Sequence, residues 1–274
     1  MQSYSYFKNL AKKGLQGNFT KCMIAFLFVS LLPVLSSALQ SKFPKSEIML
    51  LISGIVITVI LVPCFKIGAI EFLFKAISKT PASLGDIFNG FKYILKLIPV
   101  GIARLISFLP LIIASRVFIN ALPKEVMDIL LEFSNNPENI ELLNKITDAQ
   151  LNTMLIMELV FIASIIISIY LNTHLSLCEY ILCNERVSGI KSVIRSIKLM
   201  RGHILYYIGF SLSFILWYLF AAFTGGLSLI ILYPYQQAAY IMLYMELLYR
   251  EAKKNGEINN DEIKNDDNIK EDIV

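Results

Sequence analysis

Long apolar runs recur along the chain, and charged residues are concentrated between these runs. A helix needs about 20 apolar residues to cross the hydrocarbon core of a bilayer, where lipid offers no partner to free backbone groups. Six runs approach that length, and each predicts a transmembrane helix. They cover approximately residues 22–39, 49–65, 97–119, 155–171, 204–223 and 228–248. We therefore predict an all-α fold, a polytopic helical membrane bundle with six transmembrane helices in a single domain, residues 1–250.

The first run also resembles a cleavable signal peptide, because basic residues precede it and the small residues Ser36, Ser37 and Ala38 lie near its end. Three features favour a retained span instead. The leader before the run is long, Pro33 lies within the run, and further apolar runs follow.

Lys and Arg residues are distributed unequally between alternate connections, which predicts the orientation of the spans. Nineteen fall in the N-terminus, the second and fourth connections and the C-terminal tail. Only four fall in the other connections, namely Lys42, Lys45, Lys124 and Lys145. Because basic residues are retained on the cytoplasmic side during insertion, we expect a multi-pass protein of the cell membrane with both termini in the cytoplasm.

The connection formed by residues 120–153 is predicted to be an external amphipathic cap, because it is acidic and apolar residues recur in it at helical spacing after Pro123 and after Pro137. Thr147 and Gln150 have the spacing of a capping box for the fourth span. Residues 251–274 mix Asn, Asp, Glu and Lys with few apolar residues, which predicts a disordered cytoplasmic tail.

A basic amphipathic stretch that leads to a glycine precedes the first, third and fifth spans, and the glycines are Gly17, Gly90 and Gly202. The residues at helical spacing are Tyr4, Phe7, Leu10 and Gly14, then Leu84, Ile87, Phe88 and Phe91, then Val187, Ile190, Val193, Ile194 and Ile197. Ser83 and Asp86 add a capping box to the second stretch. We expect three amphipathic helices that lie flat at the inner leaflet.

The even-numbered spans align with one another when Pro63, Leu171 and Pro234 are superposed. Three residues further on, each has a polar residue, namely Lys66, His174 and Gln237. The simplest interpretation is a three-fold internal repeat of two-span units. The alternative is that any helix leading into a membrane has a basic amphipathic flank.

From Glu179 to Arg250 the chain resembles a bacterial integral-membrane family, domain of unknown function nine-seven-five. The residues that carry the resemblance are Ser196-Ile-Lys-Leu-Met-Arg-Gly-His203, Leu212-Ser-Phe-Ile-Leu-Trp217, and Pro234-Tyr235 with Ala238 and Tyr244. Ala11-Lys-Lys-Gly-Leu-Gln-Gly-Asn-Phe19 and Gly85-Asp-Ile-Phe-Asn-Gly-Phe91 extend it over most of the chain. The external segment after Leu122 is longer than is usual in that family.

The resemblance implies a multi-pass membrane protein of no established activity. The family is also distantly similar to the membrane domain of some glycerophosphodiester phosphodiesterases, which implies lipid handling only by analogy.

Composition excludes several classes of function. Hydrophobic residues make up 56% of the chain and charged residues only 17%, which leaves no room for a soluble catalytic domain. The net charge of +4 does not indicate nucleic-acid binding, because the basic residues lie at the ends of apolar runs. The four cysteines lack the spacing of a metal or redox site, so we expect no metal and no cofactor.

Polar residues at membrane depth are the candidate functional residues, because burying them in lipid is costly unless they have partners. Arg116 and Glu158 lie near the outer ends of neighbouring spans and are expected to pair. Arg104 either reaches back to the interface or binds anionic lipid headgroups. Gln236 and Gln237 either bond between helices or line a path for a solute. The candidate inner-interface residues are Lys66, His174 and His203.

Two functions are compatible with this sequence. The first is a non-enzymatic membrane scaffold or lipid-associated accessory protein, whose partners are membrane lipids. The second is a transporter of a small solute or lipid, because many transporters are built from repeated units. An intramembrane enzyme is not expected, since the two histidines lie far apart and no motif of a nucleophile or metal site occurs. The sequence does not identify a protein partner.

Overall fold

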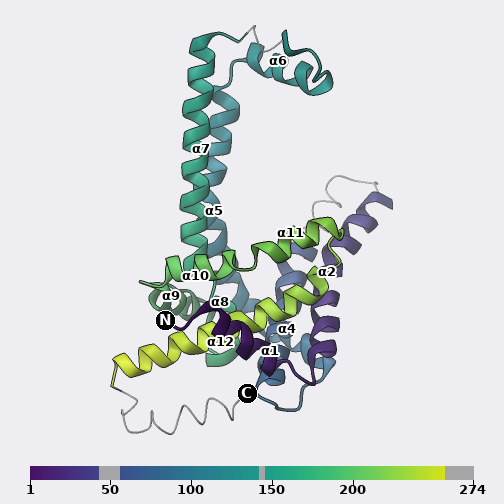
Figure 1. Cartoon of the computed structure of the whole chain (residues 1–274), viewed down its shortest axis with the longest axis vertical. Coiled ribbons are helices and arrows are strands. Elements are labelled where there is room, and N and C mark those ends of the chain that lie inside the picture. Colours follow the sequence, from purple (N-terminus) through teal and green to yellow (C-terminus); the bar gives the residue numbers. More distant parts are fainter. Residues whose placement is uncertain (43–55, 142–145, 257–274) are drawn as a thin grey trace. The chain divides into compact units, whose positions relative to one another are not determined.

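A computed structural model describes residues 1–42, 56–141 and 146–256 of the chain (Figure 1). Every regular element in these residues is a helix, which confirms the predicted all-α class. The chain divides into two compact units, which we describe separately. The first comprises Met1–Gly101 and His174–Val274, and the second comprises Ile102–Thr173.

The described residues form thirteen helical elements. Their bounds are α1 (Tyr4–Gly14), α2 (Phe19–Lys42), the π-helical η1 (Val56–Leu61), α4 (Val62–Ile77), the 3₁₀-helical η2 (Leu84–Tyr93), α5 (Ile94–Ala121), α6 (Lys124–Asn135), α7 (Asp148–His174), α8 (Cys178–Glu185), α9 (Gly189–Met200), α10 (Ile204–Leu212), α11 (Ile215–Phe223) and α12 (Leu229–Lys254).

The amphipathic helix α1 meets α2 at a sharp bend. Ser3 caps α1, because its side chain accepts a hydrogen bond from the backbone N–H of Tyr6 at 3.3 Å. The axes of Tyr4–Gly14 and Phe19–Val34 differ by 102°. Gly17 lies in the connection with a φ of +83°, a conformation that glycine adopts without strain. The bend allows α1 to lie across the direction of the apolar helix that follows it.

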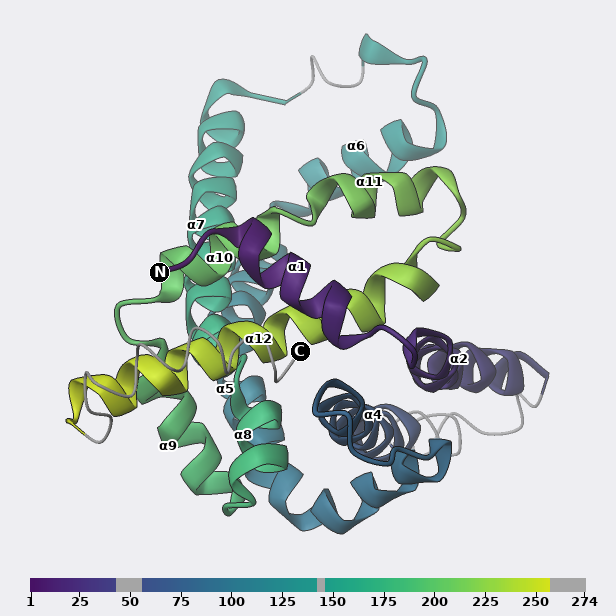
Figure 2. The ribbon, with the colours of Figure 1, turned by 60° about the horizontal axis from the view of Figure 1, so that its bottom comes forward.

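The central helix of the first unit is α12, which α1, α2 and α4 all contact (Figure 2). Its middle section is buried, including Gln236, Gln237 and the largest fully buried side chain, Tyr244. Pro234 lies within the helix and is itself buried. The core of this unit is therefore built around a helix that is less apolar than α2 and α4.

Each of the three helices that precede an odd-numbered span packs against a different partner within the first unit. Helix η2 packs on α4, α9 packs on α8, and α1 packs on α12. The first contact is very close, because Gly68 of α4 touches the carbonyl oxygen of Ile87 and Gly90 of η2 touches that of Cys64. We call α1, η2 and α9 the pre-span helices. The predicted amphipathic helices are thus present, although the second is 3₁₀-helical.

The second unit contains most of α5, with α6 and α7. Phe118 of α5 and Phe161 of α7 lie with ring centroids 6.3 Å apart. Thr147 and Gln150 form the predicted capping box at the start of α7, with reciprocal hydrogen bonds of 2.9 and 3.3 Å. Helix α6 is the first of the two amphipathic helices predicted in the cap. The second lies partly outside the described residues.

Three helical stretches among the described residues are long and apolar enough to cross a membrane. They are Leu84–Ala121, Asp148–Glu185 and Ile204–Phe223. A fourth results if Tyr4–Gly14 and Phe19–Val34 form one bent span. These stretches contain the predicted third, fourth and fifth spans and most of the first, and they indicate association with a membrane. The fifth is broken between α10 and α11.

The second and sixth predicted spans are not among these stretches. The second, residues 49–65, lies largely in residues 43–55, outside the described part of the chain. Its helix also continues to Ile77, well past the apolar run, because Lys66 and Lys75 find carboxylate partners. The sixth is contained in α12, whose glutamines and Glu246 lower its hydropathy, and α12 is not among the apolar stretches described above. Most of the predicted tail, residues 257–274, also lies outside the described residues.

Candidate functional site

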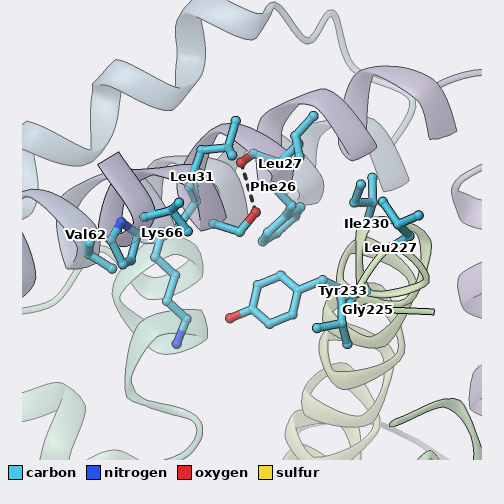
Figure 3. A pocket seen from close by; sticks show the side chains of 15 residues that line it. Phe26, Leu27, Leu31, Val62, Lys66, Gly225, Leu227, Ile230 and Tyr233 are labelled. Atoms are coloured by element: carbon cyan, nitrogen blue, oxygen red, sulfur yellow. Dashed lines mark hydrogen bonds between the residues drawn. The ribbon is translucent and has the colours of Figure 1, made fainter. Parts of the chain in front are cut away.

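A cavity of about 590 Å³ opens between α2, the start of α4 and the α11–α12 turn. Most of its lining is apolar, with Phe26, Leu31 and Ile230 among the side chains that form the walls (Figure 3). In the described part of the chain, three lining residues have polar side chains, namely Ser30, Lys66 and Tyr233. Its volume falls in the range of about 300–1,000 Å³ that is usual for small-molecule sites. This cavity is the candidate functional site.

Among the described residues that line this cavity, Lys66 is the charged one. Its Nζ lies 2.9 Å from Oε2 of Glu179, at the start of α8. The lysine side chain is 24% exposed and the carboxylate side chain only 5%. The ion pair therefore has a buried acidic partner and a basic partner that reaches the cavity. Figure 3 shows the Lys66 ammonium and the Tyr233 hydroxyl directed toward the same end of the cavity.

Glu179 was not among the candidate residues identified from the sequence. It lies 113 residues from Lys66 along the chain, so no local pattern connects the two. One signal was available, because Glu179 is the only charged residue between Leu177 and Cys183. A carboxylate in such a run requires a partner if the segment is buried.

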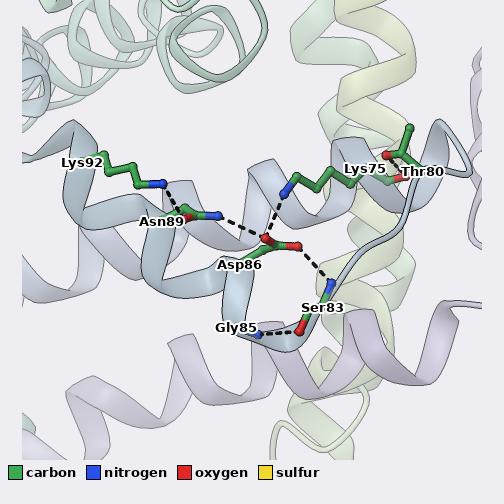
Figure 4. A network of polar contacts seen from close by, with 7 residues as sticks. All are labelled: Lys75, Thr80, Ser83, Gly85, Asp86, Asn89 and Lys92. Atoms are coloured by element: carbon green, nitrogen blue, oxygen red, sulfur yellow. Dashed lines mark hydrogen bonds and ion pairs between the residues drawn. The ribbon is translucent and has the colours of Figure 1, made fainter.

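Lys75, nine residues beyond Lys66 on α4, joins a second polar network (Figure 4). Its Nζ lies 2.8 Å from Oδ1 of Asp86 in η2. Asp86 also accepts hydrogen bonds from the backbone N–H of Ser83 at 2.9 Å and from Asn89 at 3.1 Å. Ser83 and Asp86 form the predicted capping box. This network fastens η2 to α4.

Gln236 and Gln237 bond between helices. Gln236 accepts a hydrogen bond from Tyr218 of α11 at 2.5 Å, and its amide donates to Tyr240 at 3.3 Å. Gln237 accepts one from Tyr180 of α8 at 2.7 Å. Both glutamines are buried, and neither is a lining residue of the cavity.

The two histidines lie in different places. The backbone carbonyl of His174, at the end of α7, accepts a hydrogen bond of 2.6 Å from the buried Ser196 of α9. His203 precedes α10, and its Nδ1 lies 3.2 Å from the carbonyl oxygen of Leu199. Neither residue is among those that line the cavity.

The second unit contains three charged candidate residues, Arg104, Arg116 and Glu158. Arg116 and Glu158 are both exposed, and no ion pair joins them, so the predicted pair is wrong. Phe118 faces α7, and a residue two positions away lies on nearly the opposite face of a helix, which directs Arg116 away from α7. Arg104 is half-buried on α5, and its carbonyl accepts a hydrogen bond from Ser107.

A further cluster of charges joins α8, α9 and α12. Arg195 bonds to both carboxylate oxygens of Glu251, at 2.7 and 2.6 Å, and its Nε lies 3.4 Å from Glu185. Burial lowers the pKa of Arg195, but the hydrogen bonds and charges of Glu251 and Glu185 outweigh it and raise this pKa. Glu185 also accepts a hydrogen bond from Tyr244. These residues hold the end of α12 against α9.

Comparison with known proteins identifies the family but no characterised relative. No curated protein and no solved structure matches the chain. These comparisons do not show the predicted similarity to the membrane domain of glycerophosphodiester phosphodiesterases. Residues 1–251 match the family model described as Protein of unknown function (DUF975). The match covers far more than half of the chain, so the protein belongs to the DUF975 family.

Proposed function

We propose that this protein is a non-enzymatic, multi-pass membrane protein that holds a membrane lipid in the cavity between α2, α4 and α12. The main evidence for this function is the composition of the cavity. Its lining is almost entirely hydrocarbon, which suits an acyl chain and offers a polar solute few hydrogen bonds. Such a site fits a lipid-associated accessory protein better than an enzyme.

The surface of the pre-span helices supports a location in a bilayer. On α9, Ser192 and Ser196 face the protein and are fully buried, whereas Ile190 and Ile194 are each 62% exposed. On η2, Phe88 is 59% exposed while Ile87 is buried. Helices that bury small or polar residues and expose apolar ones are suited to contact with lipid at a membrane interface.

The six-span topology, with both termini in the cytoplasm and residues 120–153 outside, is part of this proposal. The turn between α11 and α12 supports the last hairpin, because Gly225 and Gly226 adopt positive φ values of +59° and +87°. The basic residues of the pre-span helices support the orientation.

The three-fold repeat is also proposed, and the packing of the pre-span helices supports it. Helices η2 and α1 each contact a helix that contains an even-numbered span, α4 and α12, whereas α9 contacts α8, which follows the fourth span along the chain. The first pre-span helix thus packs against the last span, which is compatible with three copies around an axis. The aligned residues Lys66 and Gln237 both bond to α8, at Glu179 and Tyr180. If the repeat is real, it favours the second candidate function, a lipid or small-solute transporter.

The proposal is tested by native mass spectrometry of the detergent-extracted, full-length protein. We expect a retained lipid in the native chain. Ile230 lines the cavity, so Ile230→Trp is expected to fill it and to abolish retention. Ile231→Trp is the matched control, because Ile231 is 47% exposed and is not a lining residue. Retention that is absent in the native chain, or equal in the two variants, contradicts the proposal.

A further inference from the structure

The two side chains of the Lys66–Glu179 ion pair differ in exposure. The carboxylate is almost completely buried, and the ammonium reaches the cavity while it contacts that carboxylate at 2.9 Å. An ammonium group has three N–H donors. One is directed to Glu179, which leaves donors for an acceptor in the cavity.

The polar groups that can bind a ligand lie at one end of the cavity. The Ser30 hydroxyl donates to the carbonyl oxygen of Leu27 at 2.9 Å, so its own helix satisfies it. The Tyr233 ring packs edge-on against Phe26, with centroids 5.4 Å apart. Its hydroxyl makes no hydrogen bond within the described part of the chain and points to the same end as the Lys66 ammonium (Figure 3). The cavity therefore has one end with hydrogen-bond donors and an apolar remainder.

We infer that the cavity selects an amphiphile with an acidic head, a phosphate or a carboxylate, which binds the Lys66 ammonium and the Tyr233 hydroxyl. The hydrocarbon part of the ligand lies along the walls formed by α2 and the α11–α12 turn. This inference rests on the proposed function and adds the class of lipid. Lysine binds phosphate as a point charge, and a charge-assisted hydrogen bond is stronger than a neutral one.

Glu179 sets the strength of this site. It neutralises Lys66, which is required for a lysine in surroundings of low dielectric constant. An acidic ligand then shares the ammonium with a carboxylate that repels it. Removal of the carboxylate and removal of the ammonium are therefore expected to change acid binding in opposite directions, which a role in folding alone does not predict.

The test uses the full-length protein, purified in a neutral detergent and washed free of lipid. Phosphatidic acid with a fluorescent chain is titrated against diacylglycerol with the same chains, and oleate tests the carboxylate. We expect both acids to bind more tightly than diacylglycerol. Lys66→Met is expected to weaken acid binding by about tenfold or more, and Glu179→Gln to strengthen it at least about threefold. Inorganic phosphate is expected not to compete, and competition by it would overturn the assignment of an amphiphile.

Lys75→Met is the matched control, because Lys75 lies on the same helix in an ion pair of 2.8 Å and does not line the cavity. It is expected to leave acid binding unchanged. If Lys66→Met fails to fold, the double variant Lys66→Met/Glu179→Gln removes the carboxylate together with its lysine and is expected to bind acids and diacylglycerol alike. Binding of all amphiphiles with equal affinity by the native chain overturns this inference and leaves the proposed function intact. Binding of none overturns both.

Discussion

Gly90 of η2 lies directly against the carbonyl oxygen of Cys64 in α4, with no space for a Cβ between them. The neighbouring Gly68 lies equally close to the carbonyl oxygen of Ile87. The two glycines thus allow two backbones to touch, as small residues do where helices approach closely in membranes. The repeated sequence pattern predicts Gly90 at the end of an amphipathic stretch, and the structure shows that Gly90 is also a packing residue.

Gly90→Ala should therefore destabilise the contact between η2 and α4. A backbone carbonyl cannot rotate away as a flexible side chain does, so the helices must separate, at a cost of about 2 to 3 kcal/mol. The measurement is the thermal unfolding midpoint in detergent micelles. Gly101→Ala is the control, because nothing lies within 4 Å of its Cβ position, and its stability should change by less than about 1 kcal/mol. Equal midpoints for the two variants would show that the contact does not contribute to stability.

Ser196→Ala should loosen the junction between α7 and α8. The fully buried Ser196 hydroxyl donates to the carbonyl of His174 at 2.6 Å and accepts from the N–H of Leu177 at 3.3 Å. Its removal leaves two backbone groups without this partner, which costs about 1 to 3 kcal/mol. The exposed Ser37 bonds only within its own helix, to Val34, so Ser37→Ala should change the unfolding midpoint little. A Ser196→Ala midpoint as high as that of the control contradicts this role.

Local sequence patterns predict the structure correctly where neighbouring residues determine it. The capping boxes of Ser83 with Asp86 and of Thr147 with Gln150 both form, because each needs only a spacing of three residues. The amphipathic stretch of α9 is a helix, as predicted from its periodicity.

Contacts between distant residues could not be predicted in the same way. Positive-inside counting and span lengths place Arg116 and Glu158 at similar depth, but depth leaves the rotation of each helix about its axis undetermined. The contact of Phe118 with Phe161 sets that rotation. Lys66 was identified by its place in the repeat, whereas its partner Glu179 becomes evident only once α8 packs against α4.

Arg195 and Glu251 are expected to show a favourable coupling in a double-mutant cycle. The planar guanidinium contacts both carboxylate oxygens, and their side chains are 31% and 16% exposed, so solvent screens the pair partly. We expect about 1 kcal/mol of coupling in unfolding free energy, between the values for surface and buried pairs. Arg195→Lys should lose most of it, because an ammonium cannot make the two parallel bonds.

The control pair for this cycle is Arg250 with Glu246, joined at 2.8 Å within one helix. Pairs of that kind contribute about 0.3 to 0.5 kcal/mol. A coupling for Arg195 with Glu251 that is no larger than this would mean that the cluster does not fasten α12 to α9.

The proposed topology places α6 and α9 on opposite sides of the membrane, and single cysteines at exposed positions test it. Glu132 of α6 and Lys191 of α9 are both exposed, whereas the four native cysteines are buried and should react slowly. In intact cells, a membrane-impermeant maleimide should label Glu132→Cys and leave Lys191→Cys unlabelled until the membrane is permeabilised. The native chain, treated in the same way, gives the background.

Labelling of Lys191→Cys from outside would reverse the orientation deduced from the basic residues. Labelling of both positions would exclude a membrane between them, because one impermeant reagent cannot reach both sides of a sealed bilayer.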